Sequence, residues 1–337
     1  MTSRLLDKLF SPSEAFDQPA TVGMLIGIGI ALLIVPLVVE GLGRTGRMSP
    51  PLRTEIYVRY VSWLVIIPAM LAPVLLGPGA TILAIGALSL LCYREFARAT
   101  GCFRHRAISA VVALGIVALT FASLDHWYNF FVALPSLTIS LIAIVALARD
   151  EPRGYIQRVA LGVLSFILFG VCFGHLGYMA NDQDYRPIII LIVLCVEAND
   201  VFAFVAGKAF GRRRLAPATS PSKTVGGSIG AIGLTSGLFA TIGHFVFRGT
   251  VLDAPVHLLT MGVMLSVVGQ FGDLVISSVK RDLGIKDMGS LIPGHGGLLD
   301  RFDSVVLVAP AMFHYIGYFR GIGLDQPTRL FTGDAGG

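Results

Sequence analysis

Charged side chains are concentrated between Ser277 and Asp303, in a chain of which only 14% is charged. Two carboxylates, Asp300 and Asp303, stand three residues apart and share one face if their segment is helical. A glycine-containing turn at 293–297 precedes them, and glycine lets a backbone approach a ligand closely. Carboxylates beside cations suit a complex of a metal ion with phosphate. The charged and histidine side chains of this segment are Lys280, Arg281, Asp282, Lys286, Asp287, His295, Asp300, Arg301 and Asp303.

A second candidate segment runs from Lys208 to Gly230 and contains Ser-Pro-Ser-Lys-Thr at 220–224, followed by glycines at 226 and 227. Glycines at the start of a helix present backbone N–H groups to phosphate, and Lys223 adds a positive charge. The three arginines at 212–214 are more typical of a basic anchor at the inner membrane surface. The segment predicts a phosphate-binding loop formed by Ser220, Lys223, Thr224 and Gly227.

Acidic residues also lie inside long apolar stretches. Asp200 follows Glu197 in one stretch, and Asp273 lies near the end of another. An ionisable side chain within a membrane span is costly and is a functional candidate by default. We expect both aspartates to lie at the same depth as the two carboxylates of the first segment. The alternative is that they make separate polar contacts between packed helices.

The elements that must position these residues are membrane helices. The chain has 337 residues, 54% of them hydrophobic, and a mean hydropathy of +0.76, which indicates a polytopic all-α membrane protein. The shortest predicted span is Gly79–Tyr93. The four cysteines form no CxxC pair, so neither a zinc site nor a disulfide framework is indicated. The ten predicted spans are Ala20–Val39, Tyr57–Leu76, Gly79–Tyr93, Ala107–Leu124, Asn129–Leu147, Val159–Ala180, Ile188–Ala206, Ser228–Phe247, Val256–Ile276 and Phe302–Phe319.

The basic residues predict the orientation of these spans. With both termini outside, 20 of the 26 Lys and Arg fall in cytoplasmic loops, as the positive-inside rule requires. The same distribution accounts for the net charge of +5 without a nucleic-acid partner. We divide the chain into N-terminal spans at 1–187, a catalytic region at 188–319 with cytoplasmic loops at 207–227 and 277–301, and a polar tail at 320–337.

The charged segment resembles the signature of the phosphatidate cytidylyltransferases (CDP-diacylglycerol synthases), S-x-hydrophobic-K-R-x4-K-D followed by P-x-H-G-G-x-x-D-R-x-D. The 220–224 segment resembles the family's S-P-x-K-T block, and the resemblance covers about Glu197 to Ser304. The residues in register with the first signature are Ser277, Val279, Lys280, Arg281, Lys286, Asp287, Pro293, His295, Gly296, Gly297, Asp300, Arg301 and Asp303.

This resemblance implies a membrane nucleotidyltransferase that makes CDP-diacylglycerol and pyrophosphate from CTP and phosphatidate. It implies Mg²⁺, with a monovalent cation such as K⁺ as an optional second ion. The chain would then be an integral protein of a bacterial inner membrane, acting on phosphatidate of the inner leaflet from a site facing the cytoplasm, and a homodimer is compatible with it. In this interpretation Asp200, Asp273, Asp300 and Asp303 hold metal; Lys223, Lys280 and Arg281 neutralise phosphates; Lys286, Asp287 and His295 organise the loop; Arg301 is a further catalytic residue; and Ser220, Lys223, Thr224 and Gly227 bind CTP.

Two positions depart from the family pattern. Gly226 stands where Glu or Gln is common, and Ile276 stands where the family carries Glu. Either Ile276 replaces a lost metal ligand, which Ile276→Glu would restore, or the position has been repacked with a hydrophobic side chain. The alternatives for function are a CTP-dependent polyprenol or phytol kinase, a membrane transporter, and a catalytically weak paralogue.

Overall fold

The computed structural model describes residues 9–46, 48–148, 150–292, 296–321 and 329–333. Within these residues ten helices are long and apolar enough to cross a membrane, which confirms the all-α fold and the ten predicted spans. Nine spans are single helices, and the sixth combines α7 (Tyr155–Ser165), a π-helical segment (Phe166–Cys172) and α8 (Phe173–Met179). The single helices are α2 (Pro19–Arg44), α3 (Pro50–Leu76), α4 (Pro78–Thr100), α5 (Arg106–Leu124), α6 (Tyr128–Leu147), α9 (Tyr185–Phe210), α10 (Val225–Val246), α11 (Pro255–Asp282) and α12 (Leu299–Arg320).

Local chemistry sets many of the helix ends. Proline begins α2, α3, α4 and α11, where its missing N–H costs no hydrogen bond. Helix α4, the shortest span in the sequence prediction, is 23 residues long and continues past Tyr93 to Thr100. It ends at Gly101, whose φ of 75° favours glycine. A glutamate on this added part of α4 proves important for the site.

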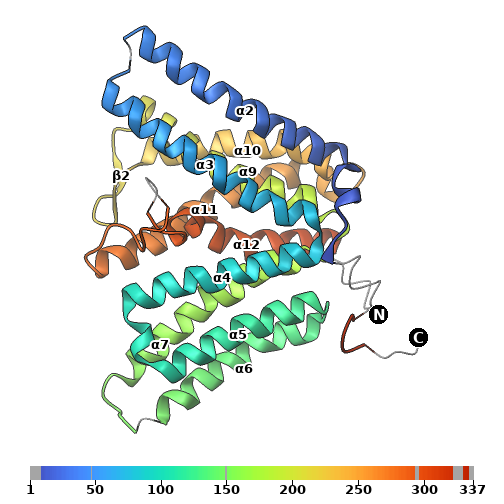
Figure 1. Cartoon of the computed structure of the whole chain (residues 1–337), viewed down its shortest axis with the longest axis vertical. Helices are drawn as coiled ribbons and strands as arrows, with labels where there is room; N and C mark the ends of the chain where they lie inside the picture. The colour runs from blue at the N-terminus through green and yellow to red at the C-terminus, as the bar shows by residue number, and fades with distance from the viewer. Residues whose placement is uncertain (1–8, 47, 149, 293–295, 322–328, 334–337) are drawn as a thin grey trace.

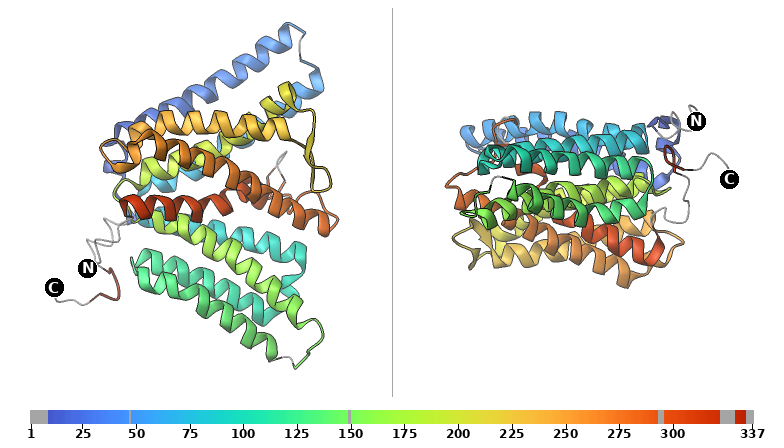
Figure 2. Two further views of the ribbon diagram at one scale, coloured as in Figure 1. Left: turned by 180° about the vertical axis from the view of Figure 1, so that it is seen from behind. Right: turned by 90° about the horizontal axis from the view of Figure 1, so that it is seen from below.

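The helices run side by side, with α2 at one edge of the bundle and the α5–α6 hairpin at the other (Figures 1 and 2). Helices α9, α10 and α11 pack closely near the middle. A Cβ atom at Gly262 of α11 would lie 2.6 Å from the Ser236 Cα atom of α10, so this glycine permits the close approach. Helix α2 diverges from α10 toward the end of the bundle that carries β2 (Figure 1).

A ladder of uncharged polar side chains fixes how α9, α10 and α11 face one another. Asn199 Oδ1 of α9 accepts hydrogen bonds from Thr235 Oγ1 of α10 at 3.0 Å and from Ser266 Oγ of α11 at 2.5 Å. Gln270 Nε2 donates to Ser266 Oγ at 3.2 Å, and Ser228 Oγ donates to Gln270 Oε1. Because these groups have no water to bind within a bilayer, their pairing fixes the rotation of each helix. This orientation places Asp200 and Asp273 toward the same region.

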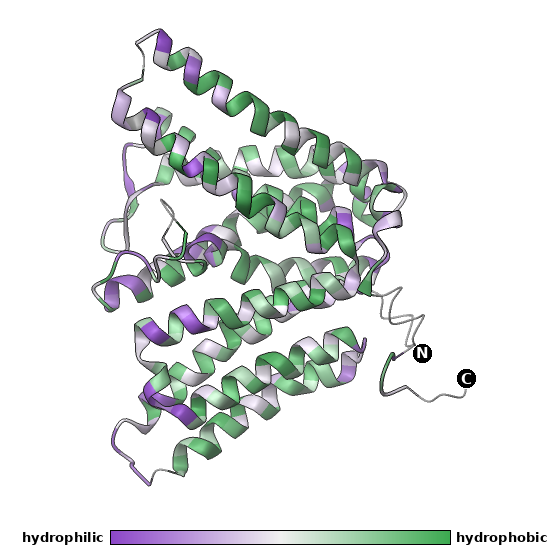
Figure 3. Ribbon diagram, viewed as in Figure 1, coloured by the Kyte–Doolittle hydropathy of each residue, from purple (hydrophilic) through white to green (hydrophobic). Residues whose placement is uncertain are grey.

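The polar connections gather at one end of the bundle (Figure 3). A two-stranded antiparallel hairpin, β1 (Arg214–Ala216) and β2 (Ser220–Thr224), joins α9 to α10. The sequence interpretation had not anticipated these strands. The loop between α11 and α12 lies at the same end, and it is shorter than predicted because α11 continues to Asp282.

The orientation in the membrane is a prediction that a fusion experiment can test. The start of α2 and the end of α12 lie at the end of the bundle opposite the hairpin (Figure 1). With an even number of spans and the basic loops inside, a reporter fused after Gly337 should be non-cytoplasmic. Alkaline phosphatase there should be active, and the same enzyme inserted at 217–219 should be inactive. The opposite pair of results would show that the orientation is the reverse of the predicted one.

Candidate active site

Charged side chains from four elements meet at the hairpin end of the bundle. Five carboxylates (Glu197, Asp200, Asp273, Asp300 and Asp303) lie within electrostatic range of three cations (Lys223, Lys280 and Arg301). They come from α9, β2, α11 and the start of α12. The four aspartates proposed as metal ligands and three of the proposed cations are therefore neighbours, although up to 103 residues separate them in the chain.

Lys223 and Asp273 form a direct ion pair between β2 and α11. The lysine Nζ atom lies 2.5 Å from Asp273 Oδ2, and Ser277 Oγ donates to Asp273 Oδ1 at 2.9 Å. Both charged side chains keep about a fifth of their surface exposed. The pair therefore connects the end of the hairpin to α11, and the Nζ atom of Lys223 is itself buried.

Asp300 is occupied on both oxygens. Lys280 Nζ donates to Oδ1 at 2.9 Å, and the backbone N–H groups of Met288 and Gly297 donate to Oδ2, each at 2.9 Å. Both the lysine and the aspartate are buried. A carboxylate with one buried cation and two N–H partners holds the α11–α12 loop closed against the helix ends.

Asp303 and Arg301 are less fully paired. Asp303 is buried, and its Oδ1 accepts from the Ser304 N–H at 2.7 Å, while Asp200, Asp273, Lys280 and Arg301 all act on it electrostatically. Among the described residues, buried Arg301 Nε has no hydrogen-bond partner. Asp200 is exposed although it lies ten residues inside the end of α9. The cluster therefore combines open carboxylates with an unused guanidinium donor.

Glu95 is a site residue that the sequence interpretation missed. Its two carboxylate oxygens accept the backbone N–H groups of Leu298 at 3.0 Å and Leu299 at 2.8 Å, at the start of α12. A Cβ atom at Gly289 or Gly297 would lie within 2.7 Å of this carboxylate, so both glycines are needed for its approach. An acid at a helix N-terminus satisfies unpaired donors and favours the helix dipole. The sequence did contain a signal for this residue, because Glu95 is the only acidic residue in the arginine-rich segment 94–106.

The other predicted residues surround the cluster. Arg281 is exposed and donates to the carbonyls of Thr219 and Ile285, so it links the hairpin to the α11–α12 loop. Thr224 Oγ1 caps α10 by accepting from the Gly227 N–H at 3.1 Å. Lys286 and Asp287 are exposed on the loop, and Ser220 begins β2. His295, with Pro293 and Gly294, lies outside the described residues.

The cluster suits a divalent cation by charge and by donor type. Its five carboxylates and three cations leave an excess of two formal negative charges. In the described part of the chain, no three His, Cys, Asp or Glu side chains already form a metal-binding group. Mg²⁺ commonly takes only one or two protein carboxylates and completes its shell with substrate phosphates and water. The residues therefore fit Mg²⁺ bound together with a nucleotide.

Both departures from the family pattern are accommodated by packing. A Cβ atom at Gly226 would lie 2.5 Å from the Phe210 carbonyl oxygen, so the backbone leaves no space there for a larger residue. Ile276 is 1% exposed and belongs to the hydrophobic core. The structure thus favours repacking over a simple loss of a ligand at position 276.

For Ile276→Glu we now expect no gain in metal affinity and a loss of stability. The new carboxylate would be buried among apolar side chains within a membrane span. This costs about 2–3 kcal/mol near the centre of the bilayer. Thermal denaturation in detergent and Mg²⁺ titration of CTP turnover check this, with Ile276→Leu as the control for packing. Tighter Mg²⁺ dependence in Ile276→Glu would support the lost-ligand interpretation instead.

Carboxylates and cations gathered at one end of a bundle of apolar helices suit the binding of a metal–phosphate complex. The sequence model of the cytidylyltransferase family matches residues 57–319, and the chain belongs to that family. This confirms the family predicted from the two motifs.

Curated relatives agree with this assignment. The chain is 35% identical over 214 residues to the phosphatidate cytidylyltransferase of Bacillus subtilis (strain 168), covering 61% of this chain and 78% of the relative. It is 33% identical to the phosphatidate cytidylyltransferase of Staphylococcus haemolyticus (strain JCSC1435), covering 61% and 76%. It is also 31% identical to the uncharacterised protein YnbB of Escherichia coli (strain K12), covering 56% of this chain and 64% of YnbB.

Proposed function

We propose that this protein is a phosphatidate cytidylyltransferase, which converts CTP and phosphatidate into CDP-diacylglycerol and pyrophosphate. The observation that carries the proposal is the convergence of both motif segments. Lys223 of the 220–224 motif contacts Asp273, and Lys280 and Asp300 of the 277–303 motif form a second ion pair. The family membership and the names of the relatives support the same reaction.

In the proposed reaction an oxygen of the phosphatidate phosphate attacks the α-phosphorus of CTP. The bond from the α-phosphorus to the oxygen bridging to the β-phosphorus breaks, and that oxygen leaves with pyrophosphate. The protein has little covalent chemistry to perform, so positioning and charge neutralisation dominate. Arg301 has an unused buried Nε donor for a phosphate oxygen, and Lys223 brings a second positive charge next to Asp273.

The nucleotide would lie against the hairpin and the start of α10. Ser220, Lys223, Thr224 and Gly227 belong to this segment, and Thr224 holds the first turn of α10 by its cap. The N-terminus of a 22-residue helix favours an anion. Arg281 ties the hairpin to the α11–α12 loop and would keep the two binding segments together.

Asp273 and Asp303, with Asp200 nearby, are the proposed Mg²⁺ ligands. When bound, the ion would neutralise negative charge on the triphosphate and stabilise the negative charge that develops on the leaving oxygen. Asp300 was grouped with these ligands on sequence grounds, but its oxygens already accept three hydrogen bonds. We therefore assign Asp300 to holding the loop. Binding of a second ion such as K⁺ and assembly into a homodimer remain predictions.

The setting that follows is an integral protein of a bacterial inner membrane, with its site facing the cytoplasm and phosphatidate supplied by the inner leaflet. The polar cluster at one end of an apolar bundle supports such a one-sided site (Figure 3). A transporter would carry polar groups through the whole depth of the membrane.

Purified protein supplied with CTP, phosphatidate and Mg²⁺ tests the proposal. We expect CDP-diacylglycerol and pyrophosphate in equal amounts. A CTP-dependent lipid kinase would instead release CDP and phosphorylate an alcohol, so the two nucleotide products separate these functions. Absence of CDP-diacylglycerol under conditions where the Bacillus subtilis relative is active would reject the assignment.

A further inference from the structure

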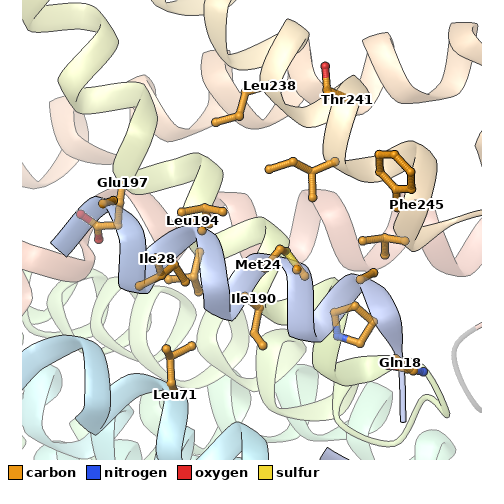
Figure 4. Close-up of a pocket in the computed structure, with 18 of the residues that line it drawn as sticks. Gln18, Met24, Ile28, Leu71, Ile190, Leu194, Glu197, Leu238, Thr241 and Phe245 are labelled. Carbon is orange, nitrogen blue, oxygen red and sulfur yellow. The ribbon is translucent and has the colours of Figure 1, made fainter. Parts of the chain in front are cut away.

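A large apolar cavity lies between α2, α3, α9 and α10. Its volume is about 960 Å³, near the upper end of the range of about 300–1,000 Å³ typical of ligand sites. Figure 4 shows Met24 and Ile28 of α2 beside Ile190 and Leu194 of α9, with Leu71 of α3 nearby. The long walls are therefore hydrophobic and come from four spans.

Glu197 is the member of the charged cluster that also lines this cavity. This side chain lines one end of the cavity and is also within electrostatic range of Asp200 and Arg301. At the opposite end lie Gln18 and Asp184, which are joined by a hydrogen bond of 2.5 Å. Figure 4 shows Glu197 and Gln18 at opposite ends of the lining. The apolar cavity therefore begins at Glu197, on the side of the charged cluster.

Depth explains why an enzyme of this kind would need such a space. Asp200 lies ten residues from the end of α9 at Phe210, about 15 Å along the helix. If the phosphate of a lipid reaches this depth, its acyl chains extend further across the membrane than those of the other lipids in the same leaflet. From Glu197 to Pro187 the cavity follows α9 for about 15 Å. This length matches one half of a hydrocarbon core about 30 Å thick.

We propose that this cavity receives an acyl chain of the lipid substrate while its phosphate occupies the charged cluster, and that α2 sets which chain lengths fit. The proposal rests on the function proposed above. The match to the family begins at residue 57, so the wall formed by α2 is not part of what that match describes. Gly23 and Gly27 line the cavity, and neither has any atom within 4 Å of a Cβ built upon it. These glycines leave room for a ligand beside α2.

Filling this room should change chain-length selectivity. Gly27→Phe places a ring in the cavity, whereas Gly29→Phe places one on the same helix outside the lining, where a Cβ also meets no atom. We expect Gly27→Phe to lower kcat/KM for dioleoyl-phosphatidate at least about tenfold relative to dioctanoyl-phosphatidate. The KM for CTP should be unchanged, and Gly29→Phe should keep the wild-type ratio of the two lipids.

The outcomes separate this inference from the function itself. Wild-type protein inactive with both lipids would reject the proposed function. If wild-type protein is active, two results would overturn the acyl-chain site alone. Either Gly27→Phe keeps the wild-type ratio of kcat/KM for the two lipids, or it changes this ratio as much as Gly29→Phe does.

A labelling experiment on wild-type protein does not depend on either variant. Phosphatidate with a photoactivatable group near the end of one acyl chain should label α2 residues such as Met24, and unlabelled phosphatidate should compete. Equal labelling by a phosphatidylcholine analogue, without competition, would show that the cavity holds bulk membrane lipid and would overturn the proposal.

Discussion

Asp303→Asn should lower CDP-diacylglycerol formation by about 10²–10³-fold, the scale found when one preorganised electrostatic group is removed from an active site. The amide oxygen can still accept the Ser304 N–H, so the start of α12 should keep its structure. The substitution removes a negative charge from a group that Asp200 and Asp273 repel. Folded protein should therefore be at least as stable as wild type without Mg²⁺, while its apparent Mg²⁺ affinity falls.

The matched control is Asp125→Asn. Asp125 is also buried, but it lies in another part of the molecule and accepts the backbone N–H of Phe331 at 2.5 Å. Its loss should leave turnover within about threefold of wild type. Turnover at limiting Mg²⁺ and thermal denaturation with and without Mg²⁺ measure both variants. Near-normal turnover in Asp303→Asn at limiting Mg²⁺ would remove Asp303 from the proposed metal ligands.

Glu95→Ala should disable the enzyme although Glu95 contacts neither proposed substrate directly. It leaves the N–H groups of Leu298 and Leu299 without their acceptor, at about 1–3 kcal/mol for each donor kept from water. The start of α12 and the loop held by Asp300 would then shift. A displacement of about 1 Å in a reacting group can reduce the rate about 10²-fold. We expect a loss of this order in kcat, with a lower melting temperature.

Two variants distinguish positioning from a general loss of folding. Glu95→Gln keeps one oxygen acceptor, so it should retain at least about a tenth of wild-type kcat. Glu40→Ala removes a glutamate that pairs with Arg44 and Arg53 between α2 and α3, and it should leave kcat nearly unchanged. If Glu95→Ala retains kcat within twofold of wild type, its contact with α12 does not position the site.

The spans were predictable because a bilayer requires about 20 apolar residues at each crossing, a signal carried by every stretch of sequence on its own. The ten helices follow this signal, including α4, whose apolar part is short and whose last turns carry charged residues. The motif spacing also predicted that Asp300 and Asp303 lie three residues apart on a helix, and both belong to the first two turns of α12. These features depend on neighbours within one segment.

The pairings within the site could not be read in the same way. Lys223 of β2 meets Asp273 of α11, and Glu95 of α4 meets Leu299 of α12 across 204 residues, because three-dimensional packing brings these elements together. Spacing showed that Asp300 and Asp303 share a face but not that backbone N–H groups would occupy Asp300. The cavity beside α2 likewise depends on how four spans diverge, which hydropathy does not encode.

The contact of Glu95 with α12 has a consequence for biosynthesis. Helix α4 is the third span to leave the ribosome and α12 is the tenth, so six further spans are synthesised before the partner of this carboxylate. Lys280 likewise meets Asp300 only after the last span enters. A chain in which α12 has not yet been synthesised therefore lacks the assembled site. Catalysis begins only when synthesis of the whole bundle is complete.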